Sequence, residues 1–357
     1  MRLDRMASKG VGLALSAAIF FGASAPVAKA LLEAVSPQLL AGLLYLGSGA
    51  GLLALWLGRR RADRHRGRTA EAPLGWTDLP WLAGAILAGG IVAPVLLMLG
   101  LTRTAATTAS LLLNLEGVLT AALAWLLFRE HVHGRIVIGM LAIVAGGALL
   151  SWQGRLASGA LAGPLAVAGA CLAWAVDNNL TQKVSASDPV QTTMLKGLVA
   201  GATNTLFALR VGSGWPSGGI LLAALVVGFL GYGVSLVLYV RALRELGTAR
   251  TGAYFALAPF IGAALGIVLW REPVTPLFAA AAALMGLGLW LHLTEQHEHR
   301  HTHEAVEHSH PHVHDAHHRH AHAPDDPPGE PHAHRHRHEP LTHVHPHYPD
   351  IHHRHSH

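Results

Sequence analysis

The feature that most limits what this chain can fold into is a succession of apolar segments. A membrane-spanning helix needs about 20 mostly apolar residues. Ten segments of the sequence have that length, and short polar stretches separate them: residues 10–32, 37–58, 79–101, 105–128, 134–152, 160–182, 189–211, 219–241, 249–270 and 274–293. The sequence therefore predicts an all-α polytopic membrane protein with ten transmembrane helices.

The composition supports a bilayer rather than a water-soluble environment. Charged residues make up 13% of the 357 residues, against about 25% in soluble domains. The one cysteine, Cys171, lies inside an apolar segment, so neither a disulfide framework nor a cysteine-based zinc site is expected. The net charge of +5 comes from short loops rather than from a basic face, so we expect a lipid bilayer as partner and no nucleic acid.

Loop charges predict the orientation, because Lys and Arg concentrate on the cytoplasmic side of membrane proteins. If the N-terminus is cytoplasmic, fifteen Lys and Arg residues lie on the inner side and five on the outer side. The basic stretch at residues 59–68, which we predict to be a cytoplasmic loop, holds six of the fifteen. Ten spans also return the C-terminus to the cytoplasm. We therefore predict a multi-pass inner-membrane protein with both termini cytoplasmic.

The two halves of the membrane region resemble each other at a fixed spacing. Residues 100–130 align without gaps onto residues 242–272, 142 positions later, and the pair Arg129-Glu130 falls on Arg271-Glu272. Each half contains five predicted spans, an odd number, so the second half is expected to be inverted relative to the first. We predict a first five-helix repeat at 1–152, a second at 153–295 and a disordered tail at 296–357.

The same residues carry a family resemblance. The chain resembles the EamA-type branch of the drug/metabolite transporter superfamily over roughly residues 10–293. The resembling motifs are Phe21-Gly22-Ala23-Ser24, Ser36-Pro37, Leu115-Glu116-Gly117 running to Phe128-Arg129-Glu130, and Ala258-Pro259 running to Trp270-Arg271-Glu272. The resemblance implies ten helices in two repeats and export of small organic solutes. The sequence departs from the family pattern at Gly117, where a proline is usual, and at Leu44, where a basic residue is usual.

Polar residues inside the predicted spans mark a candidate transport pathway. A charge at the bilayer centre costs about 2.5–3.5 kcal/mol on insertion scales, so such residues usually face a cavity or a partner. The candidates are Glu116, Thr120, Asp177, Asn178, Lys196 and Thr203. Glu116 is interpreted either as a carboxylate that binds a proton or cation, or as a neutral, hydrogen-bonded structural group. Asp177 and Lys196 fall at similar depth, so they can form an ion pair that is either functional or purely structural.

Enzyme chemistry is not expected. The sequence contains no Gly-rich phosphate loop followed by Lys-Ser/Thr, and no Ser–His or Cys–His arrangement inside the membrane. No cofactor is required, and transport would draw on an ion or substrate gradient.

The C-terminal tail is rich in histidine, mostly as His-x-His. Alternate residues of an extended chain share a face, so neighbouring imidazoles can chelate zinc, nickel, cobalt or copper. The alternative is a disordered, pH-responsive polar tail without a dedicated metal. The candidate metal ligands are His297, His299, His301, His303, His308, His310, His312, His314, His332, His334, His336, His338, His343, His345 and His347.

Three functions are consistent with these features. The leading hypothesis is a secondary transporter, an exporter of a small solute, with a metal-binding cytoplasmic tail. The alternative is an exporter of divalent zinc, nickel or cobalt that uses the tail for capture or sensing, although the spans contain few metal ligands. A membrane anchor for a metal-buffering tail is disfavoured, because an anchor needs one helix. The sequence assigns no substrate, coupling ion or oligomeric state.

Overall fold

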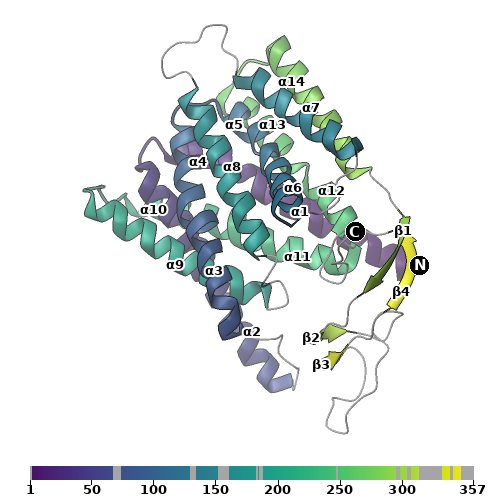
Figure 1. Ribbon diagram of the computed structural model, residues 1–357. Coiled ribbons are helices and arrows are strands. Elements are labelled where there is room, and N and C mark those ends of the chain that lie inside the picture. The colour runs from purple at the N-terminus through teal and green to yellow at the C-terminus, as the bar shows by residue number, and fades with distance from the viewer. Residues whose placement is uncertain are drawn as a thin grey trace.

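The computed structural model describes residues 2–66, 74–128, 134–151, 161–181, 184, 188–246, 248–294, 298–303, 307–312, 332–337 and 341–346. Up to Leu293 these residues are almost entirely helical, and the helices form one bundle (Figure 1). In the first half the helices are α1 (Arg2–Leu31), α2 (Pro37–Arg66), η1 (Trp76–Asp78), α3 (Leu79–Ala85), η2 (Ile86–Val92), α4 (Ala93–Leu101), α5 (Ala106–Leu112), α6 (Asn114–Phe128) and α7 (Gly134–Ser151). In the second half they are α8 (Ala162–Thr181), α9 (Pro189–Arg210), α10 (Gly218–Gly228), η4 (Phe229–Val234), α11 (Ser235–Leu246), α12 (Thr248–Phe255), α13 (Ala258–Trp270) and α14 (Pro276–Leu293).

Each predicted apolar segment coincides with one helix or with a run of helices. Among the described residues, six stretches are long and apolar enough to cross a membrane: Gly10–Leu31, Pro37–Arg59, Trp76–Leu101, Ala106–Leu123, Gly134–Ser151 and Gly218–Ala242. Two shorter apolar helices, Ala258–Trp270 and Pro276–Leu291, follow. The long helices α8 and α9 carry four of the six candidate pathway residues, and α6 carries the other two, Glu116 and Thr120. The structure thus supports the all-α membrane fold.

The predicted basic loop at residues 59–68 is in large part helical, because α2 continues to Arg66. Arginine and alanine are good helix formers. The change from apolar to basic residues therefore marks where the chain leaves the apolar layer, but it does not end the helix.

The third apolar segment contains a π-helix, η2, between α3 and α4. Pro94 explains the break, since it has no N–H to donate to the carbonyl of Gly90 or Gly89 one turn earlier. A second π-helix, η4, lies between α10 and α11. The two π-helices are 142–143 residues apart at both ends, so the repeat seen in the sequence extends to this irregular feature.

The fourth and ninth apolar segments are each interrupted as well. The first is divided at Leu113 between α5 and α6, where the side chain of Asn114 donates to the carbonyl of Leu111 at 2.9 Å. The second is divided between α12 and α13, where Pro259 opens the new helix. The helices α5 and α12 begin 142 residues apart, at Ala106 and Thr248.

Contacts at the helix ends define two ends of the bundle. At one end, here called the Lys29 end, Lys29 in the last turn of α1 meets Thr104 after α4 and Glu272 after α13. At the other end, the side chain of Arg135 at the start of α7 meets Thr294 after α14. Glu272 also contacts Ala106 at the start of α5, so α12–α13 and α5–α6 run in opposite directions. Equivalent parts of the two halves are therefore inverted.

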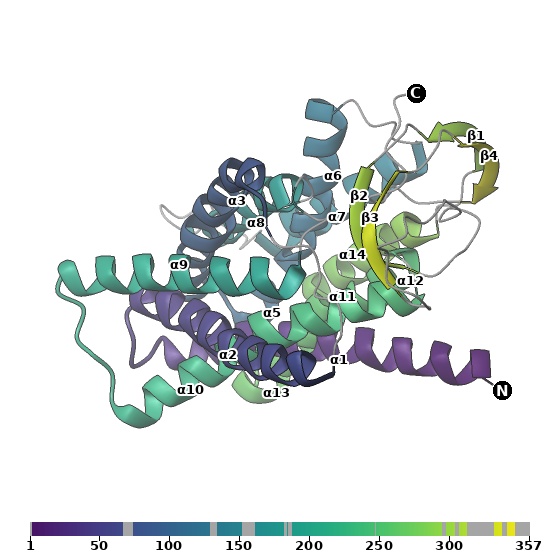
Figure 2. The same cartoon turned by 90° about the horizontal axis from the view of Figure 1, so that it is seen from below.

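Equivalent helices of the two halves pack against each other, α2 on α9 and α7 on α14 (Figures 1 and 2). Glycines bring these backbones together. A Cβ on Gly197 of α9 would lie 2.6 Å from the backbone nitrogen of Gly49 in α2, and one on Gly288 would lie 2.5 Å from the carbonyl oxygen of Gly139. Small residues of this kind allow the close approach on which helix association in membranes depends.

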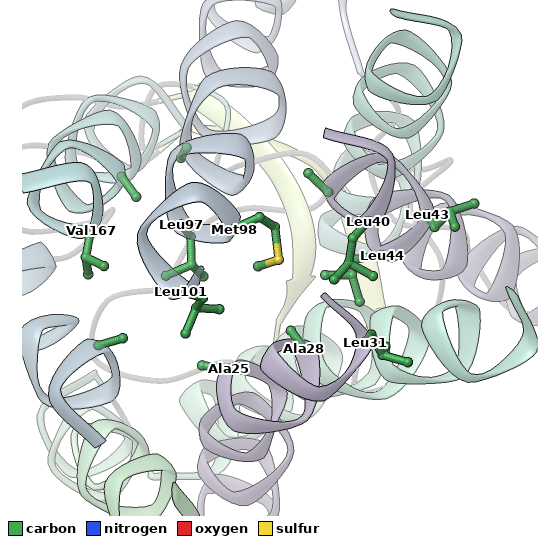
Figure 3. Packing of buried hydrophobic residues seen from close by; sticks show 14 of the residues in the cluster. Ala25, Ala28, Leu31, Leu40, Leu43, Leu44, Leu97, Met98, Leu101 and Val167 are labelled. Carbon is green, nitrogen blue, oxygen red and sulfur yellow. The ribbon is translucent and has the colours of Figure 1, made fainter. Parts of the chain in front are cut away.

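The largest apolar cluster closes the bundle toward the Lys29 end. It joins the last turns of α1 and α4 to the first turns of α2 and α8, and its side chains meet in Figure 3. Leu40, Leu44, Leu97, Met98 and Leu101 are at most 1% exposed. This half of the bundle is therefore sealed by packed side chains.

The tail differs from the disordered segment that the sequence predicted. The structure describes four short strands: β1 (Glu298–His303), β2 (Glu307–His312), β3 (His332–Arg337) and β4 (Leu341–Pro346). They form two antiparallel pairs, β1 with β4 and β2 with β3, on the side where the N-terminus emerges (Figures 1 and 2). The His-x-His alternation has the period of two that an extended strand requires, which accounts for the difference.

Candidate functional site

Glu116 lies near the start of α6, three residues after the interruption at Leu113. Its carboxylate accepts a hydrogen bond from the side-chain amide of Asn178 in α8 at 2.9 Å. The same amide lies 3.3 Å from the hydroxyl of Thr120, one turn further along α6. Glu116 is half-buried, Asn178 is exposed, and a Cβ on Gly117 would meet nothing within 4 Å. The carboxylate is therefore partly accessible and is held by a neutral partner.

Asp177, the neighbour of Asn178 on α8, points to a different helix. The ammonium of Lys196 in α9 donates to both carboxylate oxygens of Asp177, at 2.6 Å each, and the hydroxyl of Thr181 donates to Oδ1 at 2.9 Å. The side chain of Lys196 is 17% exposed and that of Asp177 is 6% exposed. Burial without a counter-ion would be costly for either group, so the pair ties α8 to α9.

Asp177 and Asn178 connect the two halves of the predicted site. Consecutive residues of a helix point about 100° apart, so one side chain reaches α9 and the next reaches α6. Glu116, Thr120, Asn178, Asp177 and Lys196 thus form one polar cluster across three helices, here called the Glu116 cluster.

Thr203, the sixth predicted pathway residue, lies outside this cluster. Its hydroxyl donates to the carbonyl of Val199 in its own helix at 2.8 Å, and the residue is exposed. A helix drifts by about 20° over seven residues, and Lys196 already lies at the edge of the buried face of α9. Thr203 therefore turns away, and the buried polar residue of that turn is Asn204, which is 1% exposed.

The carbonyls of η2, two of them freed by Pro94, collect polar side chains that were not predicted from the sequence. The hydroxyl of Tyr45 and the indole N–H of Trp174 both donate to the carbonyl of Gly89, at 2.7 and 3.0 Å. The amide of Asn204 lies 3.3 and 3.2 Å from the carbonyls of Gly90 and Ile91. The signal for these residues was Pro94 inside an apolar segment, because its missing N–H leaves carbonyls that need outside donors.

The π-helix also contacts the Glu116 cluster directly. A Cβ on Gly89 would collide with the carboxylate of Asp177, so only glycine permits this approach. Helix η2 therefore brings its carbonyls beside the ion pair.

Aromatic side chains extend from this region across the bundle. Ring centroids lie 5.5 Å apart for Tyr45 and Tyr232, 6.1 Å for Tyr232 and Phe21, 5.4 Å for Phe21 and Phe255, and 4.8 Å for Phe255 and Tyr239. This row of rings begins at Tyr45, whose hydroxyl contacts the carbonyl of Gly89 in η2. Flat, polarisable rings of this kind suit an organic solute.

Metal ligands were predicted in the tail. Of these, His297, His314, His338 and His347 lie outside the described residues. In the strands, the backbone register sets His299 opposite His345, His301 opposite His343, and three histidines of β2 opposite three of β3. Among the residues that the structure describes, no group of three or more His, Cys, Asp or Glu side chains is arranged to hold a metal ion.

Two related halves, inverted relative to each other, and charged side chains that meet between apolar helices define an integral membrane transporter. The chain belongs to the EamA-like transporter family, whose model matches it twice, over residues 8–152 and 161–294. The family assignment predicted from the sequence motifs is confirmed.

Two further comparisons agree with this assignment. A protein described as an uncharacterized transporter in Methanothermobacter thermautotrophicus is 28% identical over 283 residues, which cover 76% of this chain and 82% of the relative. A crystal structure of a protein with 22% sequence identity matches 80% of this chain and 98% of its own length, with a TM-score of 0.59. The second likeness is one of fold.

Proposed function

We propose that the protein is a secondary transporter that exports a small organic solute across the inner membrane, with ten crossings in two inverted five-helix repeats and both termini cytoplasmic. The two family matches and the inverted direction of α5–α6 and α12–α13 support the repeats. The distribution of Lys and Arg supports the orientation.

The contrast between two carboxylates carries the proposal. Asp177 is neutralised by Lys196 at 2.6 Å, whereas the described partner of Glu116 is the neutral amide of Asn178. A half-buried carboxylate without a cationic partner in the described part of the chain is able to bind a proton or the cationic group of a solute, and to release it when the surroundings change. Glu116 is therefore the group we assign to substrate binding or to proton coupling.

The test is a comparison of Glu116→Gln with Glu33→Gln. Both changes remove one carboxylate charge and keep the shape, but Glu33 is exposed between α1 and α2. Cells that express each variant are challenged with a panel of toxic metabolite analogues and metal salts, and retention of each compound is measured. We expect Glu116→Gln to lose most of the export that the wild type provides, and Glu33→Gln to retain it.

Normal export by a fully inserted Glu116→Gln protein would contradict the proposal. Where export is found, the same proteins in vesicles with an imposed pH gradient separate the two roles of Glu116. A coupling carboxylate makes flux depend on the gradient, and that dependence is lost in Glu116→Gln. If Glu116 only binds a cationic solute, Glu116→Gln should leave the flux of uncharged substrates unchanged.

We further assign divalent-metal binding to the tail. The cross-strand register places histidine opposite histidine on five rungs, and directly opposed residues have Cβ atoms about 4.5–5.5 Å apart. Full-length protein should bind zinc or nickel, and a chain lacking residues 297–357 should not. Binding should weaken as the pH falls through about 6.5, where imidazoles protonate.

The tail deletion also tests the alternative of a divalent-metal exporter. If metal is the cargo, both the tail deletion and Glu116→Gln should raise the metal content of the cells. If metal only binds the tail, deletion should leave export of the organic solute intact.

A further inference from the structure

Helix α5 begins without a cap of its own. The residue at its N-cap position is Ala105, which has no side-chain acceptor. Instead, Glu272 reaches across from the end of α13 and accepts hydrogen bonds from the backbone N–H groups of Ala106 and Thr107, at 2.8 and 3.0 Å. The hydroxyl of Thr107 donates to the same carboxylate. A carboxylate in this position satisfies free N–H groups and complements the positive end of the helix dipole.

The backbone at the end of α13 is shaped to deliver this carboxylate. Arg271 ends the helix with φ 49°, in the left-handed region that residues other than glycine rarely adopt. The chain therefore turns sharply before Glu272 instead of continuing the helix. Strain of this kind persists where the surrounding contacts hold it in place, and here the contacts are those with α5.

Helix α1 joins the same contact. The ammonium of Lys29 lies 3.8 Å from Glu272 Oε1, donates to the carbonyl of Thr104 at 2.7 Å and lies 5.9 Å from the ring centroid of Trp270. The indole N–H of Trp270 lies 3.4 Å from the carbonyl of Pro26. Three elements from both halves of the chain are thus tied together at the Lys29 end.

This contact lies beside the apolar cluster that seals the same end, whereas Glu116 is half-buried and its partner Asn178 is exposed. A transporter with alternating access must at some stage part its halves at the Lys29 end. Because Glu272 belongs to one half and the start of α5 to the other, parting them breaks the cap. We infer that Glu272 is a latch that holds the Lys29 end closed until the transported solute is to be released there.

The exposures explain why such a latch is reversible. Lys29 and Glu272 retain side-chain exposures of 24% and 15% at the end of the bundle, so both groups gain water when the contact opens. The pair of Asp177 and Lys196 is more deeply buried and ties α8 to α9 within one half. The first pair is therefore suited to repeated opening, and the second to permanent support.

The chain provides its own reporter and its own control. Cys171, the one cysteine, is fully buried in the apolar cluster, where its thiol lies 3.6 Å from the carbonyl of Leu112 at the end of α5. Thr275, three residues after Glu272, accepts a hydrogen bond from the N–H of Phe278 and so caps α14 within its own helix. Thr275→Ala therefore removes a helix cap at the same end without separating the two halves.

The experiment measures two rates for full-length protein in lipid nanodiscs. A charged methanethiosulfonate reports the accessibility of Cys171, and hydrogen–deuterium exchange reports the amides of residues 106–107. We expect Glu272→Ala to accelerate both by about tenfold or more, since a charge-assisted cap is lost. Glu272→Gln and Lys29→Met should give smaller increases, and Thr275→Ala should leave Cys171 at the wild-type rate.

Three results overturn the latch. Faster amide exchange with unchanged Cys171 labelling makes Glu272 a static cap. Equal labelling in Glu272→Ala and Thr275→Ala means general loosening, and no change in either rate means that the contact does not hold the end closed. The latch rests on the proposed function, but neither rate needs a substrate. The proposed function is contradicted if Glu116→Gln keeps its export, and the latch is contradicted if Glu272→Ala does not open. Either result can occur without the other.

Discussion

At the scale of single residues, the Glu116 cluster contains two carboxylates in different surroundings. Asp177 is paired with the ammonium of Lys196, whereas Glu116 accepts a hydrogen bond from the neutral amide of Asn178. Residue type and depth in the apolar segments were enough to identify five of its members. They were not enough to exclude Thr203, because a drift of about 20° over seven residues decides which side chain of α9 faces inward. Tyr45 and Trp174 were missed since both look like ordinary apolar-segment residues until the free carbonyl of Gly89 is known.

The ion pair allows a residue-scale prediction. Lys196→Met leaves the carboxylate of Asp177 buried without a counter-ion, which should lower the free energy of unfolding by about 3–5 kcal/mol. The double variant Lys196→Met/Asp177→Asn should recover most of that loss in a detergent-melting measurement. Thr203→Val, outside the cluster, serves as the control and should change little.

Export by the double variant then assigns the role of the pair. If export returns together with stability, Lys196 is structural. If the protein is stable but inactive, Lys196 contacts the solute. A double variant as unstable as Lys196→Met would show that the two side chains are not energetically paired.

At the scale of elements, the sequence located the helices but not their irregularities. The period and length of apolar segments predict where a span lies. The π-helix η2, in contrast, receives donors from other elements, since Tyr45 belongs to α2 and Asn204 to α9. The continuation of α2 to Arg66 differs from the prediction for another reason, because a change from apolar to basic residues ends the apolar segment but not the helix.

The π-helix η2 gives an element-scale prediction. Tyr45→Phe should cost about 1 kcal/mol of unfolding free energy, because the carbonyl of Gly89 loses its shorter hydrogen bond. Pro94→Ala returns an N–H to this segment, so Tyr45→Phe should cost close to nothing in that background. A double-mutant cycle measured by thermal unfolding tests this coupling.

Tyr254→Phe is the matched control, as the same hydroxyl is removed from the half-buried Tyr254 in α12, away from η2. Equal costs of Tyr45→Phe with and without Pro94 would show that the proline is not the origin of the free carbonyl.

At the scale of the whole molecule, the repeat was the most informative part of the sequence. The offset of 142 residues relates the starts of α5 and α12, and both π-helices recur within one residue of it. The sequence did not show that Glu272 contacts α5, although the match of Arg129-Glu130 with Arg271-Glu272 had already drawn attention to these residues. Contacts across the two halves require the fold, because they join residues 165–166 positions apart.

Orientation in the bilayer is the prediction at this scale. Reporter fusions at Gly67 and His357 should be active for a cytoplasmic reporter and inactive for a periplasmic one. A fusion at Ser213, between α9 and α10 at the Lys29 end, should give the opposite result. A periplasmic signal at Gly67 or His357 would show that the charge distribution does not set the topology.

The cap that Glu272 places on α5 also bears on how the chain could have arisen. If the gene were cut between α7 and α8, the product carrying α5 would lack the carboxylate that completes that helix, and the other product would carry it without a recipient. Two such polypeptides would have to associate to complete the cap, as the subunits of a two-fold symmetric dimer complete each other's contacts. A fused pair of once-identical subunits inherits that mutual dependence and is then free to let the two sides of it diverge.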